Sequence, residues 1–164
     1  MESILSYVGE HIGAVEVDDG YELRHGDHVL GWLGDPKFEL AVRCVTRGSE
    51  WTFKRLRGGD TEATSGTAVV ARYKSNFLPG GTIELPDESR FRLRPPATGE
   101  KWRLRRGRRE ILLELRPMRD GWEIRFKPAA REIHQLPLVA MVALHAALVE
   151  LDRPTGDGPS APSG

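Results

Sequence analysis

The residues best suited to chemistry in this sequence are nine basic side chains between residues 90 and 109. Arginine presents a planar fork of donors that matches phosphate oxygens, and lysine adds a compact positive charge. The whole chain carries 24 basic and 24 acidic residues, so this cluster is a local excess and not a consequence of net charge. We predict an anionic-ligand site at Arg90, Arg92, Arg94, Lys101, Arg103, Arg105, Arg106, Arg108 and Arg109.

The pattern around these basic residues favours a lipid surface over nucleic acid. Apolar residues alternate with the arginines, which places one set on a dry sheet face and the other on a wet face. A polybasic surface gains about 1 kcal/mol per basic residue near an anionic membrane. Nucleic acid is disfavoured because Phe91, Trp102 and Trp122 point to the dry face, away from any base that would stack on them. The alternative is an ordinary solvated face, neutralised by nearby acids such as Glu88, Glu100, Glu110 and Glu114.

Other chemical constellations are weak. His25, Asp27 and His28 surround a Gly-Asp turn, but a zinc site needs three or four ligands in a rigid frame, so we interpret them as a polar turn. No nucleophile elbow, phosphate-binding glycine loop or metalloprotease histidine pair occurs in the sequence. We therefore predict neither metal nor cofactor and a protein that is not an enzyme. An enzyme whose scattered residues meet at one mouth of a barrel remains the alternative.

Most of the chain has the period of two that is typical of β-strands. Residues 21–24 and 28–33 predict a hairpin, and Phe38, Leu40, Val42 and Cys44 are expected on one dry face of the next strand. Residues 58–66 are expected to form a loop. Further dry faces are predicted at Trp51 and Phe53, at Val69, Ala71 and Tyr73, at Ile83 and Leu85, at Phe91 and Leu93, at Trp102 and Leu104, at Ile111, Leu113 and Leu115, and at Trp122, Ile124 and Phe126.

Residues 136–151 form the strongest predicted helix, and this helix has almost no polar side. Only His145 and Glu150 interrupt its apolar residues, so it must be covered all round. Sixteen residues rise about 24 Å, less than the roughly 30 Å of a membrane core. We expect His145 to be a core histidine hydrogen-bonded to a strand, and Cys44 to be a buried structural thiol.

A sheet curled around this helix is the simplest structure that hides it. We therefore predict a mainly β fold, a closed antiparallel barrel of about twelve strands around a central hydrophobic C-terminal helix. Residues 1–19 are expected to be an N-terminal segment with a short helix from Glu2 to Ile12. Residues 20–152 form the barrel, with the helix at 136–152, and residues 153–164, rich in Pro, Gly and Ser, are expected to be a disordered tail.

The order and spacing of these elements resemble a known superfamily. The run from Gly81-Thr82-Ile83-Glu84-Leu85 through Phe91, Trp102-Arg103-Leu104 and Ile111-Leu112-Leu113 to one apolar helix is similar to the tubby C-terminal-like proteins. This superfamily includes the tubby domain, the phospholipid scramblases and the LURP-one-related proteins. The resemblance covers roughly residues 20–152 and implies a barrel around a helix, with a phosphoinositide-like lipid as a candidate partner. Since the Cys-rich segment and acidic calcium loop of scramblases are missing, lipid scrambling is not expected.

These observations together predict a non-catalytic binding or scaffold module that contacts anionic phospholipid through a basic sheet face. The single cysteine and the absence of a basic, then apolar, signal peptide favour the cytoplasm. We expect peripheral contact with the inner membrane face, no transmembrane span, and no protein partner that the sequence identifies.

Overall fold

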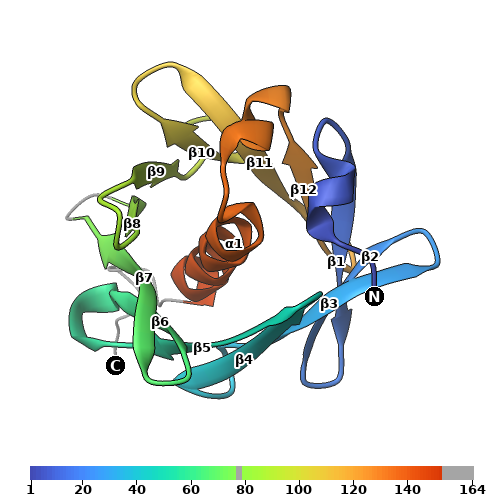
Figure 1. Ribbon diagram of the computed structural model, residues 1–164, viewed down its shortest axis with the longest axis horizontal. Coiled ribbons are helices and arrows are strands. Elements are labelled where there is room, and N and C mark those ends of the chain that lie inside the picture. Colours follow the sequence, from blue (N-terminus) through green and yellow to red (C-terminus); the bar gives the residue numbers. More distant parts are fainter. Residues whose placement is uncertain (77–78, 153–164) are drawn as a thin grey trace, which may run out of the picture.

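The computed structural model, which describes residues 1–76 and 79–152, is a closed antiparallel barrel of twelve strands around one helix (Figure 1). Three short 3₁₀ helices accompany it: η1 (Ile4–Tyr7), η2 (Arg57–Gly59) and η3 (Pro128–Glu132). The strands are β1 (His11–Val17), β2 (Gly20–His25), β3 (His28–Gly34), β4 (Ala41–Thr46), β5 (Ser49–Arg55), β6 (Thr61–Ser65), β7 (Ala68–Ser75), β8 (Gly81–Glu84), β9 (Arg90–Arg94), β10 (Trp102–Arg106), β11 (Glu110–Met118) and β12 (Gly121–Phe126). The fold class is thus confirmed. The tail expected at 153–164 lies outside the described residues.

The N-terminal segment belongs to the barrel, which corrects the expected boundary at residue 20. Strand β1 pairs with β12 on one side and β2 on the other, and these two ladders close the sheet. The helix expected from Glu2 to Ile12 is reduced to the single turn of η1. Ile12 and Ala14 alternate inward from β1, and burying them between two ladders outweighs the weak helical pattern, which Gly9 already interrupts.

Strands β9, β10 and β12 follow the predicted alternation closely. Strands β9, β10 and β12 point their Phe, Trp, Leu and Ile residues into the barrel, where each is at most 5% exposed. The exception is β11, where the register shifts between Leu104 and Arg105 of the partner strand β10. As a result Leu112 is fully buried, whereas Ile111, which was expected to point inward, is only partly covered. A bulge of this kind moves one extra residue to the dry face and cannot be read from alternation.

The first strand after the hairpin is shorter than predicted. Val42 and Cys44 are buried, but Phe38 and Leu40 are each 66% exposed, because β4 begins only at Ala41. The residues before it form a turn in which Phe38 N–H donates to Asp35 O at 3.2 Å. The expectation that Phe38 and Leu40 share the dry face is therefore wrong.

The loop expected at residues 58–66 contains strand β6. This strand pairs with β5 and β7 and turns Thr61 and Ala63 inward. Its small and polar residues hide the apolar alternation that marks the other strands, so the sequence pattern did not reveal it.

Helix α1 (Leu136–Asp152) runs through the barrel and is buried on every side, as predicted. All residues from Leu138 to Val149 are at most 7% exposed. Figure 1 shows the strands surrounding the helix. Within the described residues, no helix combines the length and the apolar character needed to cross a membrane.

His145 is fully buried on α1, but it lacks the expected hydrogen bond to a strand. Neither ring nitrogen has a hydrogen-bond partner among the described residues, and the ring instead meets Phe53 edge-on, with centroids 5.4 Å apart. Burial, with a smaller contribution from the charge of Arg55, lowers the pKa of His145 to about 3. Cys44 is fully buried as expected, and burial raises the pKa of its thiol.

The antiparallel order gives the barrel two distinct ends. We call the end where α1 begins the N-end; it carries η3 and the turns after β2, β4, β6, β8 and β10. The end where α1 finishes is the C-end, and it carries the connections after β1, β3, β5, β9 and β11. Since a closed barrel has no free strand edge, its contacts with partners must use the outer wall or these two ends.

Candidate anionic-ligand site

Strands β9 and β10 set arginines directly opposite one another on the outer wall. Arg94 lies opposite Arg103, and Arg92 lies opposite Arg105. Like charges that face each other across strands destabilise a sheet. Two successive pairs of this kind are therefore a feature that folding alone does not favour.

A groove of about 630 Å³ opens next to these pairs at the C-end. The β9–β10 connection, residues 95–101, forms much of its lining. Its charged residues are Arg94, Lys101, Arg103, Arg105 and Arg116, with Glu100 as the acidic one. The groove thus brings together four of the nine predicted basic residues and adds a fifth cation.

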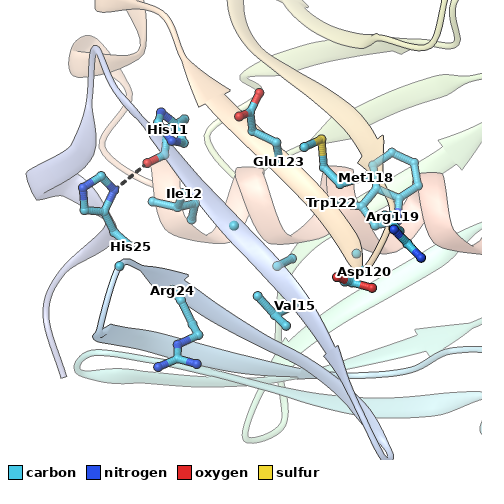
Figure 2. A pocket seen from close by; sticks show the side chains of 14 residues that line it. His11, Ile12, Val15, Arg24, His25, Met118, Arg119, Asp120, Trp122 and Glu123 are labelled. Atoms are coloured by element: carbon cyan, nitrogen blue, oxygen red, sulfur yellow. Dashed lines mark hydrogen bonds between the residues drawn. The ribbon is translucent and has the colours of Figure 1, made fainter.

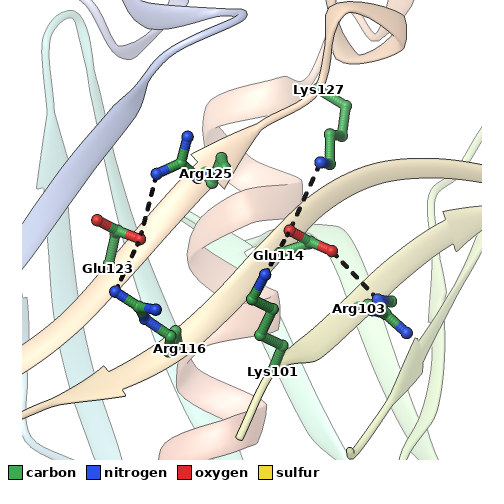
Figure 3. A network of polar contacts seen from close by, with 7 residues as sticks. All are labelled: Lys101, Arg103, Glu114, Arg116, Glu123, Arg125 and Lys127. Carbon is green, nitrogen blue, oxygen red and sulfur yellow. Dashed lines mark hydrogen bonds and ion pairs between the residues drawn. The ribbon is translucent and has the colours of Figure 1, made fainter. Parts of the chain in front are cut away.

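Glu114 on β11 neutralises one side of this basic surface (Figure 3). Its carboxylate accepts a hydrogen bond from Arg103 Nε at 3.1 Å and lies 3.5 Å from Lys127 Nζ and 3.9 Å from Lys101 Nζ. The Glu114 side chain is 8% exposed. Burial alone would raise its pKa, but the hydrogen bond from Arg103 and the charges of Lys127, Lys101 and Arg103 outweigh burial and hold that pKa below its usual range. Glu114 is therefore ionised and structural at neutral pH.

Other members of the predicted cluster are neutralised or lie elsewhere. Arg106 binds both Glu110 and Glu132, and Arg90 lies 3.6 Å from Glu84. Arg108 and Arg109 lie in the β10–β11 turn at the N-end, away from the groove. Of the nine residues, Arg94, Lys101, Arg103 and Arg105 therefore line the groove, and Arg92 faces Arg105 beside it, whereas Arg90, Arg106, Arg108 and Arg109 lie outside it.

Arg92, Arg94 and Arg105 make no ion pair with any described residue. Arg105 Nη1 donates only to the carbonyl of Arg108, at 3.2 Å, and its buried Nε has no partner in the described part of the chain. Such guanidinium groups keep donors free for an anion.

Arg116 also lines the groove, although the sequence pattern does not single it out. It lies on β11 opposite Glu123, a second acidic centre that is 3.9 Å from Arg116 Nη2 and 3.8 Å from Arg125 Nη2 (Figure 3). The alternation of β11 places Arg116 outward, but only the pairing of β11 with β10 brings it to the groove.

A second groove, of about 460 Å³, lies along β1 on the outer wall (Figure 2). Gly13 leaves it open in the middle, and Val15 and Met118 give it apolar walls. The charges around it are mixed, with Arg24 and Arg119 beside Asp120 and Glu123. It therefore lacks the large excess of basic over acidic residues found in the β9–β10 groove, the groove beside the facing arginines.

A third cavity, of about 330 Å³ at the N-end, contains Asp87, Ser89 and His134. Ser89 N–H donates to Asp87 Oδ1 at 2.9 Å, and hydrogen bonds from Ser89, with a small effect of His134, keep the pKa of Asp87 low. A hydrolytic triad needs the histidine between serine and carboxylate. Here Asp87 instead bonds the backbone of Ser89, which is the geometry of a turn.

The histidines of the Gly-Asp turn point to different partners. His25 Nδ1 lies 2.9 Å from the carbonyl oxygen of His11, and His28 Nδ1 lies 3.0 Å from Glu2 Oε2. In the part of the chain that the structure describes, no three His, Cys, Asp or Glu side chains gather as a metal site.

No protein-family model, curated protein or solved structure matches this chain.

Proposed function

We propose that this barrel is a non-catalytic binding module that holds the phosphate groups of anionic phospholipids in the β9–β10 groove. The observation that carries the proposal is the pair of arginine couples, Arg94–Arg103 and Arg92–Arg105, beside a groove with one acidic residue. Arg103 is already paired with Glu114, but a bound phosphate would relieve the repulsion among the other three arginines and use their guanidinium donors, which have no carboxylate partner in the described structure.

The size and chemistry of the groove suit a lipid head group. Its volume of about 630 Å³ falls within the range of about 300 to 1,000 Å³ that is usual for small-ligand sites. Phe91 and Trp102 on the same strands are buried, so this wall offers no aromatic platform on which nucleic-acid bases would stack. The barrel around a buried helix is also the architecture of the tubby C-terminal-like proteins, and we propose membership of that superfamily. The place of action in this proposal is the cytoplasmic face of a membrane.

Co-sedimentation with vesicles tests the proposal. Phosphatidylserine-containing vesicles are compared with pure phosphatidylcholine vesicles, with a single-stranded oligonucleotide as competitor. We expect binding only to the anionic vesicles. This binding should weaken steeply as the ionic strength rises past the physiological range, where the Debye length is about 8 Å. Absence of binding at low salt, or tighter binding to the oligonucleotide, would refute the proposal.

Charge reversal locates the site. The variant Arg94→Glu with Arg105→Glu should lose most vesicle binding, because neither side chain has a carboxylate partner in the described structure. The matched control is Arg47→Glu with Arg131→Glu, which changes net charge equally at exposed N-end positions. Arg103 is left unchanged, since reversing it would set a carboxylate against buried Glu114. Equal loss in both variants would indicate a net-charge effect without a groove.

A further inference from the structure

Two large apolar side chains stand in solvent on the connection between β3 and β4. Phe38 and Leu40 are separated by one residue, and each is 66% exposed. Exposed side chains of this size contribute little to folding, since their apolar area stays in water.

The connection that carries them is firmly held. Asp35 is buried, its carboxylate accepts from Lys37 N–H at 2.9 Å, and its carbonyl accepts from Phe38 N–H at 3.2 Å. Arg55 anchors the other side, with Nη1 donating to Pro36 O at 3.2 Å and its N–H donating to Leu40 O at 2.8 Å. The exposure of Phe38 and Leu40 is therefore built into an ordered turn.

A third apolar residue and several cations lie beside this turn. Leu56, 41% exposed, directly follows Arg55, the residue whose N–H bonds Leu40 O. Lys37, Lys54 and Arg57 are exposed and form no ion pair within the described residues. The Lys37 ammonium lies 5.9 Å from the centre of the Phe38 ring. Glu39 is the exposed acid of the same connection.

This apolar tip, defined as Phe38, Leu40 and Leu56, lies at the C-end, as does the β9–β10 groove. Met118 and Leu151, at 47% and 59% exposed, lie at the same end. A planar surface that meets the C-end would contact the tip on one side of the barrel and the groove on the other. Exposed apolar side chains with flanking cations match the chemistry of an anionic bilayer interface.

We propose that the apolar tip inserts into the interfacial layer of an anionic phospholipid bilayer and holds the barrel end-on, with its C-end toward the membrane. This inference rests on the proposed function of the groove and adds a hydrophobic anchor to it. Basic residues attract the protein in a salt-dependent way, whereas inserted Phe and Leu side chains bind by apolar burial that salt does not screen.

The test uses two double variants. The tip variant carries both Phe38→Ser and Leu40→Ser, and the control variant carries both Val15→Ser and Val29→Ser. The control residues are also exposed, at 37% and 38%, but lie on the outer wall of β1 and β3. With phosphatidylserine-containing vesicles we expect the tip variant to bind at least about tenfold more weakly, from the apolar area lost. The control should bind as the wild type does. All four side chains are exposed, so thermal unfolding should show folded proteins.

Two readouts separate this inference from the proposed function. The wild type should keep residual vesicle binding at high salt, and the tip variant should lose it. In Phe38→Trp, the fluorescence added to that of the four native tryptophans should be quenched by lipids brominated near the head group. Vesicle binding that is unchanged in the tip variant, or an added tryptophan that is not quenched, would overturn insertion and leave the groove proposal standing. A wild type that binds no vesicles would overturn both.

Discussion

Lowering the pH should destabilise this protein through His145. The folded chain buries this imidazole completely, without a hydrogen-bond partner in the described structure, and its pKa is lowered to about 3 from an ordinary value of 6.5. Below the ordinary value, the unfolded chain therefore binds a proton that the folded chain rejects. Stability rises with pH wherever the unfolded state binds more protons. The contribution of His145 is thus lost progressively as pH falls through about 6.5 toward about 3.

The expected size follows from the two pKa values. Proton linkage costs about 2 kcal/mol of unfolding free energy between about pH 7 and about pH 5. This is a large share of the roughly 5 to 15 kcal/mol that stabilises a typical domain. His145→Leu removes the titration and the two unpaired ring nitrogens at similar volume, so it should also stabilise the protein by about 1 to 2 kcal/mol at neutral pH.

The assay is urea unfolding of the wild type and His145→Leu at several pH values. The difference between the two proteins should grow by about 2 kcal/mol from about pH 7 to about pH 5. His134→Leu is the matched control, because His134 is exposed and should keep the wild-type dependence on pH. Parallel curves for the wild type and His145→Leu, or a folded-state titration of His145 near the ordinary value, would refute the reasoning.

Two further substitutions test the account of the wall and of the barrel. Glu114→Gln should lose about 1 to 3 kcal/mol of stability, measured by urea unfolding, because it removes the partner of three cations. It should nevertheless bind anionic vesicles more tightly than the wild type in co-sedimentation. Weaker vesicle binding by the folded variant would contradict the conclusion that Glu114 neutralises the basic surface. Gly31→Ala should cost about 2 kcal/mol or more, because its new Cβ would lie 2.2 Å from the carbonyl oxygen of Val45 on the neighbouring strand. Gly13→Ala, whose Cβ would have no contact closer than 3.8 Å, should unfold nearly as the wild type does, and equal losses in the two glycine variants would contradict this prediction.

The architecture was predictable because it rests on long, regular patterns. The helix at 136–152 has an apolar surface all round, and burying such a helix requires a sheet that curves around it. The strict alternation at β9, β10 and β12 likewise identifies which side chains point inward. Both patterns involve local spacing alone, and neither depends on which strands become neighbours.

The predictions failed where a bulge or a turn interrupted the apolar alternation, because both depend on contacts with other parts of the chain. The shift at Leu104 and Arg105 turned Leu112 inward in place of Ile111, and a turn organised by Asp35 left Phe38 and Leu40 outside. A bulge and a side-chain-capped turn are both set by tertiary contacts that alternation does not encode.

The candidate site could be predicted as a region but not as a set of residues. Nine basic residues stood out in the sequence, but which of them stay free depends on the carboxylates that other strands supply. Glu114 lies opposite Arg103 and neutralises it, whereas the residue opposite Arg105 on that strand is Ile111. Arg116 lines the groove because its strand, β11, pairs with β10, and this pairing cannot be read from the sequence pattern.

A closed barrel restricts where function can reside. In the described structure every strand edge is paired and α1 runs through the interior, so an added strand has no free edge to pair with. Natural sequences depart from the rules of stable folding chiefly where function requires it. Two departures on the surface are the facing arginines of β9 and β10 and the apolar tip of the β3–β4 connection. Without an anion, the positive charges of the facing arginines repel one another, and the apolar tip exposes apolar area to water. An anionic bilayer at the C-end would relieve both.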